Sequence, residues 1–549
     1  MRLDRVLLVV SLASITTLAG CAGISDCGED VAKCAAMLNA NAERCAQSFQ
    51  LQQGEAKRKH CEAAVKTVRK KAAKEAVPGL LQILAVPDSS VPNDKHRVDA
   101  AKALADIKDP SAVEPLMNAI DLGVGTSSDP KDKNANATNE NVAEALGRLG
   151  DKRACGKLTE LMKKSRHDYS VLKSVRALGE IGCKDSIGAL SDIALKHDNK
   201  FMRKNAVQAL GDIGDPAATD TLVQMMFIEY QGVSFYPEAS FSLFELGPVV
   251  APALLDLLAG KNDAVNKYFE KTGGMKDTAI KAKAGFVLGD LRDARAVEPL
   301  IEAFKAAVAA GDGVLAVYSA APLGALGDKR AVPVLKEQML TLDSSQRDPF
   351  MRALVQLGDR SVVPDMILAM GEQHFVDTCV KQGLADKETC AGDKDAMQGA
   401  LMAATDHASN FAGPEHAEAY NKAVEAVTIP KLKEYMKARG ARVEAAQECK
   451  TDVKCWIGKL SAENAFVREK AAWELSWAKD PSSLDALAKA LGDKDTFVRS
   501  AAIAAYWGFG NNKAVAAIEK QLADDEGAAT YAKVNQDLKR LLVHLKRAS

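Results

Sequence analysis

The sequence has few aromatic residues and lacks long apolar runs beyond its first segment. Aromatic residues make up 5% of the 549 positions, and only four of them are Trp. Apolar residues at 47% and charged residues at 26% are close to the average for globular domains, which excludes a disordered chain, a collagen and a polytopic membrane protein. The shortage of aromatic residues and the abundance of alanine favour packed helices over a β-sandwich.

Neither sign of charge dominates the chain. There are 72 basic and 73 acidic residues, which gives a formal net charge of −1. Because no overall positive field attracts phosphate groups, the composition argues against nucleic acid as a partner.

The short motifs that carry enzyme chemistry are also missing. The sequence contains no phosphate-binding G-x-x-x-x-G-K-S/T, no nucleophile elbow G-x-S-x-G and no zinc motif H-E-x-x-H. No two cysteines have C-x-x-C spacing and there are only eight histidines, so we expect no metal site. We therefore predict no catalytic residue, no cofactor and no small-molecule substrate.

The first segment has the features of an export signal. Arg2 and Arg5 precede an apolar stretch from Val6 to Ala19, which is too short to span a membrane permanently. It ends in Leu18-Ala19-Gly20-Cys21, which resembles a bacterial lipobox. The resemblance implies cleavage before Cys21 and lipidation of that residue, so that the lipid attaches the chain to a membrane. Ala22 in place of Asp favours the outer membrane, with the protein on its periplasmic or surface face; an ordinary signal peptide is the alternative.

Ten cysteines remain after Cys21, and most have a close neighbour in the sequence. In an exported protein an even number of cysteines indicates disulfides. Local bridges are favoured between Cys27 and Cys34, Cys45 and Cys61, Cys155 and Cys183, Cys379 and Cys390, and Cys449 and Cys455. The spacing leaves the pairing among the first four open. Such short loops contribute about 2–3 kcal/mol each and pin local segments rather than a whole fold.

One short sequence motif, which we call the phrase, recurs along the chain. It reads Ala-Leu-Gly-Arg-Leu-Gly-Asp from 145, Ala-Leu-Gly-Glu-Ile-Gly from 177 and Ala-Leu-Gly-Asp-Ile-Gly-Asp-Pro from 209. Its apolar anchor falls at positions 149, 181, 213, 246, 291, 326 and 357. A period of about 32 residues that tolerates insertions is typical of a solenoid, and each unit is predicted to be two helices.

This pattern resembles HEAT repeats of the short kind found in phycobilin-lyase-like proteins. The resemblance implies an all-α, right-handed α-solenoid of about eleven helix pairs, with a concave groove formed by the second helices. We expect one continuous array with these parts: a signal peptide at 1–20, a Cys-rich helical cap at 21–60, repeats at 61–430, a disulfide-bearing linker at 431–461, and final repeats with a capping helix at 462–549. Insertions are expected at 121–139, 260–277 and 371–392, the first of them as a mobile polar loop.

The four Trp residues are concentrated near one end. Trp456, Trp473, Trp477 and Trp507 fall within 52 positions. Trp473 and Trp477 are four apart on one predicted helix, at positions that are polar in other repeats. Because Trp is enriched at interface hot spots, these four residues are predicted to bind a partner. Packing of the rings beneath the neighbouring segment is the alternative.

These observations predict a lipid-anchored scaffold that binds envelope proteins or peptides. Solenoids present long surfaces that bind polypeptides without chemistry. A chromophore lyase of the HEAT-repeat type is the enzymatic alternative. The HEAT-like enzyme deoxyhypusine hydroxylase is excluded as a functional model, because it binds iron through His-Glu dipeptides and no histidine here precedes a glutamate.

Overall fold

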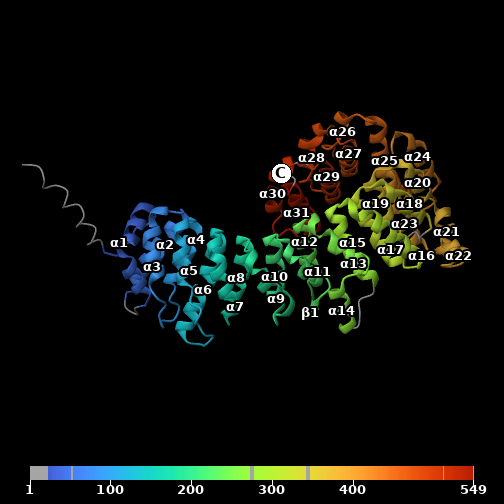
Figure 1. The fold of residues 1–549 in the computed structure, drawn as a ribbon. Coiled ribbons are helices and arrows are strands. Elements are labelled where there is room, and N and C mark those ends of the chain that lie inside the picture. Colours follow the sequence, from blue (N-terminus) through green and yellow to red (C-terminus); the bar gives the residue numbers. More distant parts are fainter. Residues whose placement is uncertain (1–22, 51–53, 273–276, 342–346, 511, 548–549) are drawn as a thin grey trace, which may run out of the picture. The chain divides into compact units, whose positions relative to one another are not determined.

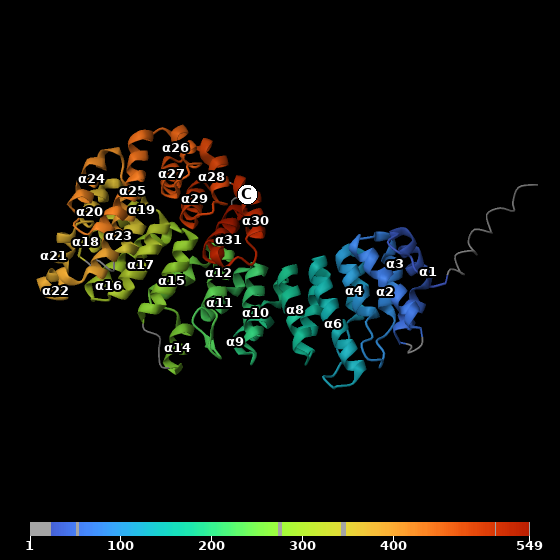
Figure 2. The same ribbon diagram turned by 180° about the vertical axis from the view of Figure 1, so that it is seen from behind.

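The computed structural model describes residues 23–50, 54–272, 277–341, 347–510 and 512–547. They form two compact units, which we call unit 1 (up to Leu246) and unit 2 (from Gly247). In both units helices follow one another in antiparallel pairs, as an α-solenoid requires (Figures 1 and 2). The all-α fold class is confirmed. That the helix pairs form one continuous array stays a prediction.

Unit 1 begins with α1 (Val31–Gln50), which packs against α2 and α3. The first helices of its pairs are α2 (Glu55–Lys70), α4 (His96–Ile107), α6 (Pro130–Leu149), α8 (Asp168–Ile181), α10 (Lys200–Ile213) and α12 (Tyr236–Leu246). The second helices are α3 (Val77–Ala85), α5 (Val113–Ala119), α7 (Cys155–Lys164), α9 (Ile187–Lys196) and α11 (Thr219–Met225). A short hairpin, β1 (Glu229–Tyr230) with β2 (Val233–Ser234), precedes α12.

Unit 2 continues the pattern. Its first helices are α15 (Asp277–Leu291), α17 (Gly313–Leu326), α19 (Asp348–Leu357), α23 (Lys394–Phe411), α25 (Pro430–Cys449), α27 (Ala465–Ala478) and α29 (Thr496–Phe509), and α31 (Ala532–Arg547) packs beside α29. The second helices are α13 (Ala251–Leu258), α16 (Val297–Ala309), α18 (Val332–Thr341), α20 (Val363–Leu368), α24 (Ala417–Ala426), α26 (Val453–Lys459), α28 (Leu484–Ala490) and α30 (Val515–Asp524). Three more helices lie between pairs: α14 (Asp263–Thr272), α21 (Glu372–Lys381) and α22 (Lys387–Gly392).

The recurring phrase forms the corner between the two helices of a pair. In α6, Gly150 ends the helix with a φ of +70°, a conformation that costs glycine little. Asp151 follows and accepts a hydrogen bond from the backbone N–H of Arg153, which caps a 3₁₀ turn that leads into α7. The same aspartate cap recurs at Asp109, Asp215, Asp293, Asp328, Asp359 and Asp480.

The glycine in the middle of the phrase lets successive first helices approach closely. A Cβ added at Gly179 would lie 2.9 Å from the Cα of Ala209, and one added at Gly147 would lie 3.0 Å from the Cα of Ala177. The first separation is shorter than real Cβ atoms show, and the second is tight enough that the neighbouring helix would have to move by a few tenths of an ångström. The Ala-Leu-Gly phrase is therefore a packing seam, with the alanine of one pair against the glycine of the previous pair.

Several predicted irregular segments are helical. Residues 121–139 were expected to be a mobile loop, but α6 begins at Pro130, with Asp129 as its N-cap. Segment 431–461 was expected to be a linker, but α25 is a 20-residue first helix that packs on α23 and α27. It lacks the Ala-Leu-Gly phrase, which is why the repeat was missed. Within 371–392 the chain forms α21 and α22, and within 260–277 it forms α14.

The cysteines pair locally. The disulfides join Cys27 to Cys34, Cys45 to Cys61, Cys155 to Cys183, Cys379 to Cys390, and Cys449 to Cys455, which are the predicted pairs. The first two stabilise the helical cap, although the cap does not end at residue 60, because α2 extends from Glu55 to Lys70. Cys21 and the signal segment lie outside the described residues.

The helices of the described residues include a single weak candidate for a membrane-spanning segment. Over the described part of the chain, no individual helix combines the length and apolarity needed to cross a bilayer, and only Tyr236–Leu246 with Pro248–Leu258 passes as a bent pair, by length and composition alone.

Candidate functional site

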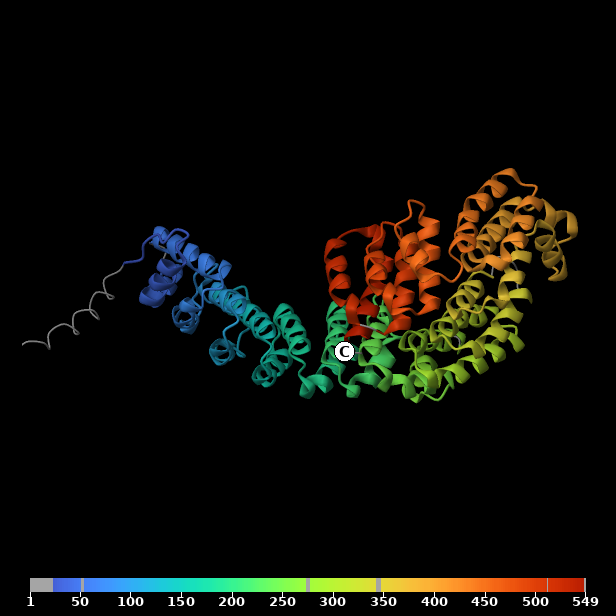
Figure 3. The same ribbon diagram turned by 90° about the horizontal axis from the view of Figure 1, so that it is seen from above.

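Unit 2 encloses a groove with a volume of about 860 Å³. Figure 3 shows its helices following a curve that brings α29 and α31 back towards α15. An ion pair between Arg540 of α31 and Asp290 of α15, at 3.0 Å, joins the two ends of the curve. The groove is lined by first helices and α31, not by second helices as predicted.

Helical spacing explains which residues reach the groove. On α27 the lining residues are Phe466, Glu469 and Trp473, which are three and four positions apart and share one face. On α29 the same spacing presents Phe497, Ser500 and Trp507 among others. Phe497 is exposed, whereas Phe466, Trp473 and Trp507 are half-buried. The groove therefore offers aromatic surface along two adjacent helices.

A cluster of charges holds the wall formed by α23, α25 and α27. Arg439 Nε donates to Asp406 Oδ1 at 2.9 Å, and its guanidinium lies over the rings of Tyr435 and Phe466, at 3.4 and 4.2 Å from their centroids. Arg442 is buried and donates to Glu469. Each guanidinium is matched by a carboxylate, which a buried charge requires.

The Glu469 carboxylate has a second partner. Asn410 Nδ2 donates to it at 2.6 Å. Within the ranges that the structure covers, Asn410 Oδ1 and Arg442 Nε are buried without a hydrogen-bond partner. The wall is therefore almost, but not fully, satisfied by its own groups.

A second charge cluster lies between α19 and α23. Asp348 Oδ1 is 2.7 Å from His407 Nε2, and Asp348 Oδ2 accepts from Arg352 at 3.0 Å. The hydrogen bond from His407 is the main reason that the pKa of Asp348 lies well below its usual range, against the opposing effect of burial. Asp348 is thus a stable anion at neutral pH and a structural partner of His407.

The third side of the groove is the junction of α15, α29 and α31. Arg292 follows α15 and its guanidinium lies 4.7 Å from the Trp507 ring centroid. The His544 ring lies 4.4 Å from that of Trp507. Burial lowers the pKa of Arg292 to about 10 and also lowers the pKa of His544, so the imidazole is neutral at neutral pH.

The predicted tryptophans occupy different environments. Trp473 and Trp507 line the groove. Trp477 stacks on Trp473, with ring centroids 5.8 Å apart, and packs behind it against Phe411. Trp456 is 2% exposed and donates its indole N–H to the Lys450 carbonyl, so it belongs to the core and its prediction as a partner contact is wrong.

A buried lysine supports Trp477. Lys470 is fully buried, donates to the carbonyls of Asn410 and Ala412 at 2.6 and 2.8 Å, and pairs with Glu474 at 2.8 Å. Burial lowers the pKa of Lys470 to about 8, while Glu474 opposes the shift. Its ammonium group lies 5.7 Å from the Trp477 centroid. This charge fixes α27 to the end of α23.

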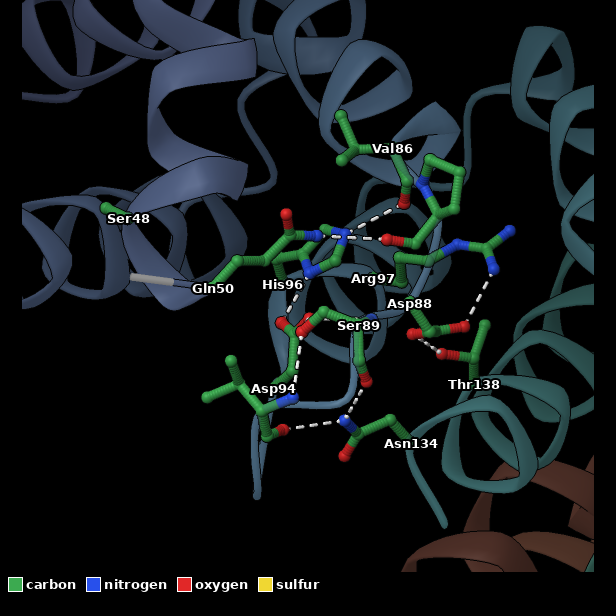
Figure 4. A network of polar contacts seen from close by, with 12 residues as sticks. Ser48, Gln50, Val86, Asp88, Ser89, Asp94, His96, Arg97, Asn134 and Thr138 are labelled. Atoms are coloured by element: carbon green, nitrogen blue, oxygen red, sulfur yellow. Dashed lines mark hydrogen bonds and ion pairs between the residues drawn. The ribbon is translucent and has the colours of Figure 1, made fainter. Parts of the chain in front are cut away.

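Unit 1 contains a second polar network, shown in Figure 4. His96 is 1% exposed; its Nδ1 lies 2.5 Å from Asp94 Oδ1 and its Nε2 lies 2.8 Å from the Val86 carbonyl. Asn134 of α6 donates to the carbonyls of Ser89 and Val91 at 2.9 and 2.8 Å. These contacts hold the segment between α3 and α4 against α6.

Other kinds of site are not evident in the residues described. No group of three His, Cys, Asp or Glu side chains there is arranged to hold a metal ion. Sequence reasoning missed the charged groove residues Arg292, Asp348, Asp406, Arg439 and Arg442. Their only signal in the sequence was a charged residue type in a first helix. Charged residues are equally common on helix faces that are exposed to solvent, so this signal does not identify a groove.

Two family matches describe the repeats. HEAT repeats match residues 171–227 and 456–534, and the PBS lyase HEAT-like repeat matches residues 97–121 and 280–306. The second HEAT span includes α27 and α29, which carry Trp473 and Trp507. The matched segments of the chain are therefore HEAT and HEAT-like repeats. No curated protein matches the sequence.

Several solved structures resemble parts of this chain at low sequence identity. The complex of CpcE and CpcF of phycocyanin lyase from a Nostoc species is 20% identical, with 45% of this chain and 86% of that chain covered and a TM-score of 0.26. Human deoxyhypusine hydroxylase in complex with glycerol is 19% identical, with 53% and 98% covered and a TM-score of 0.22. The Kap95:Nup1 complex is 10% identical, with 94% and 81% covered and a TM-score of 0.41. These likenesses concern the fold alone.

Proposed function

We propose that this protein is a lipid-anchored HEAT-repeat scaffold of the bacterial cell envelope that binds an extended segment of a partner protein in the unit 2 groove. The observation that carries the proposal is the groove itself, which brings Trp473, Trp507 and the exposed Phe497 together on adjacent helices. Tryptophan is enriched among the residues that anchor protein interfaces, and concave surfaces favour binding. The groove is open to a chain segment and large enough for several side chains.

The charged residues of the groove support binding rather than catalysis. Asp348, Asp406 and Glu469 are each engaged by a cationic or amide partner within the wall. A general acid or base needs a pKa near the working pH and a free position facing the substrate. Paired carboxylates of this kind serve instead to fix the shape of the groove. We therefore place no catalytic step in this protein.

The anchor is proposed from the Leu18-Ala19-Gly20-Cys21 segment. Cys21→Ser is expected to abolish metabolic labelling with a radioactive fatty acid and to release the protein from membranes. Ala22→Asp is expected to shift the protein towards the inner membrane in a sucrose gradient. Continued membrane binding of the serine variant would contradict the anchor.

A pull-down from detergent-solubilised envelope tests the binding function. The double variant Trp473→Ala, Trp507→Ala is expected to lose the recovered partner, because each buried tryptophan contributes about 2 kcal/mol or more at a hot spot. Phe201→Ala is the matched control, since Phe201 is 64% exposed on α10 of unit 1. An unchanged set of partners in the double variant would contradict the proposal. Recovery of a tetrapyrrole and a chromophore acceptor alone would favour a lyase instead.

A further inference from the structure

Arg292 differs from the other arginines that line the groove. Each of the others is paired with a carboxylate: Arg352 with Asp348, Arg439 with Asp406, Arg442 with Glu469 and Arg540 with Asp290. Among the residues described, no carboxylate or hydrogen-bond acceptor contacts the Arg292 guanidinium, which lies over the Trp507 ring instead. Asp290 attracts this cation from nearby without contacting it. Because a buried cation is costly unless it is directly paired, the position favours a second negative charge from a ligand.

The backbone at Arg292 also points to a role for its side chain. It ends α15 with a φ of +53°, where seven other first helices have a glycine with positive φ. A side chain in this conformation costs free energy that glycine does not pay. Lys108 and Lys479 occupy the same position in other pairs, but both are exposed, whereas Arg292 is half-buried at the groove.

The charges around Arg292 leave this end of the groove positive. Arg292, Lys533 and Arg540 line it together with Asp290 and Asp537. Asp290 is engaged by Arg540, and burial raises the pKa values of both carboxyls. His544, on Trp507, is neutral at neutral pH because burial and the nearby Arg292 lower its pKa. Asp290 attracts Arg292 from nearby, but its carboxylate forms its ion pair with Arg540, so the Arg292 guanidinium has no direct carboxylate partner in the described part of unit 2.

We propose that Arg292, held over Trp507, binds the carboxylate of a Glu or Asp side chain in an acidic segment of the partner. This inference rests on the proposed function and adds the chemistry of the bound segment. Trp507 holds the guanidinium plane in place, so that its edge can donate two parallel hydrogen bonds to a carboxylate. Lys533 strengthens the attraction for an acidic segment as it enters the groove.

The test is a titration with defined peptides at low ionic strength, followed by calorimetry on the full-length protein. The probe is an acetylated and amidated peptide of alternating glutamate and alanine. Two control peptides carry glutamine in place of glutamate, one amidated and one with a free carboxyl terminus. We expect binding of the glutamate peptide alone, and at least a tenfold weaker affinity in Arg292→Gln, because a hydrogen bond to a charged group contributes that much.

Two variants separate the role of Arg292 from a general effect of charge or folding. Arg292→Lys is expected to retain part of the affinity. Arg153→Gln in unit 1 is expected to retain nearly all of it, because Arg153 is exposed and already paired with Asp151. Circular dichroism verifies that the variants are folded. The inference is overturned by equal affinities of Arg292→Gln and the wild type, by no binding of the glutamate peptide, or by binding of either glutamine peptide.

The two proposals fail separately. If the glutamate peptide does not bind, but the double tryptophan variant loses its envelope partner, the groove remains the binding site and its preference for acidic segments is wrong. If the glutamate peptide binds through Arg292 but the double tryptophan variant keeps its partner, the partner binds elsewhere.

Discussion

The first helices of the two units present different surfaces on the same repeat. In unit 1 their exposed faces carry charges that pair from one helix to the next: Lys173 with Glu144 at 2.5 Å and Lys204 with Glu238 at 2.7 Å. In unit 2, Trp473 stands where unit 1 has Arg176 and Gln208, and Trp507 stands where unit 1 has Gly179 and Gly211. The repeat thus provides the framework, and bulky aromatic side chains at a few positions of the first helices give unit 2 the aromatic lining of its groove.

Charged pairs illustrate how differently the two units use the same residue types. Lys470 of unit 2 is fully buried with Glu474, whereas Lys173 of unit 1 is partly exposed with Glu144. Lys470→Met is expected to lower the free energy of unfolding by about 3–5 kcal/mol, because two buried carbonyls lose their donor and Glu474 keeps only Arg360 as a cationic partner. Lys173→Met is expected to change it by less than about 1 kcal/mol. Urea denaturation measures both values; equal effects would contradict the distinction.

Packing at the seam of unit 1 is the next largest expected effect. Gly179→Val is expected to destabilise the protein by about 1–3 kcal/mol, because its side chain meets α10 at Ala209. Gly188→Ala in α9 is the control, since a Cβ there has no atom within 4 Å. We expect it to be stabilising by about 0.5–1 kcal/mol, as alanine is the better helix former. Thermal denaturation measures the stability of both variants. An unchanged stability of Gly179→Val would show that the two helices can move apart at the seam.

The smallest expected effect is the dependence of stability on pH. Ionisation of one aspartate stabilises unit 2, whereas ionisation of another destabilises unit 1. Asp348 of unit 2 has a pKa below 3.8, chiefly through the hydrogen bond from His407, so its contribution to stability is present above pH 3.8 and is lost as the pH falls through the folded value. Asp212 of unit 1 has a pKa raised above 3.8 by desolvation, so its ionisation opposes folding as the pH rises through that range.

Two substitutions test these signs. His407→Gln is expected to raise the pKa of Asp348 towards 3.8, as carboxyl carbon shifts in an NMR titration would report. Asp212→Asn is expected to increase stability at pH 7 while leaving it almost unchanged well below pH 3.8. A lowered stability of Asp212→Asn at pH 7 would show that the carboxylate makes a favourable contact in unit 1.

The helix pairs could be predicted because their signals are local. Gly150 and Asp151 end one helix and cap the next turn through their own backbone and side-chain chemistry, so the phrase is sufficient. The pair that begins with α25 was missed, because that helix ends in Cys449 and has no such phrase. Disulfide pairs were predictable for the same reason, since each joins residues close in the sequence.

The groove could be predicted only in part. Trp473 was identified because it replaces a polar residue at its repeat position, which is visible in the sequence. Arg292 and Arg540 could not be placed, because their proximity depends on the curvature accumulated between α15 and α31. Trp456 was misassigned, because the sequence does not distinguish an aromatic residue on a face from one beneath the next helix.

Site-specific photo-crosslinking in living cells tests the central claim most directly. A photoreactive phenylalanine analogue replaces Ser500, which lines the groove on α29, or Gln208, which is exposed on α10 of unit 1. The account predicts a crosslinked envelope protein at Ser500, lost when Trp473 and Trp507 are changed to Ala, and none at Gln208. A crosslink at Gln208 without one at Ser500 would contradict the assignment of binding to the groove.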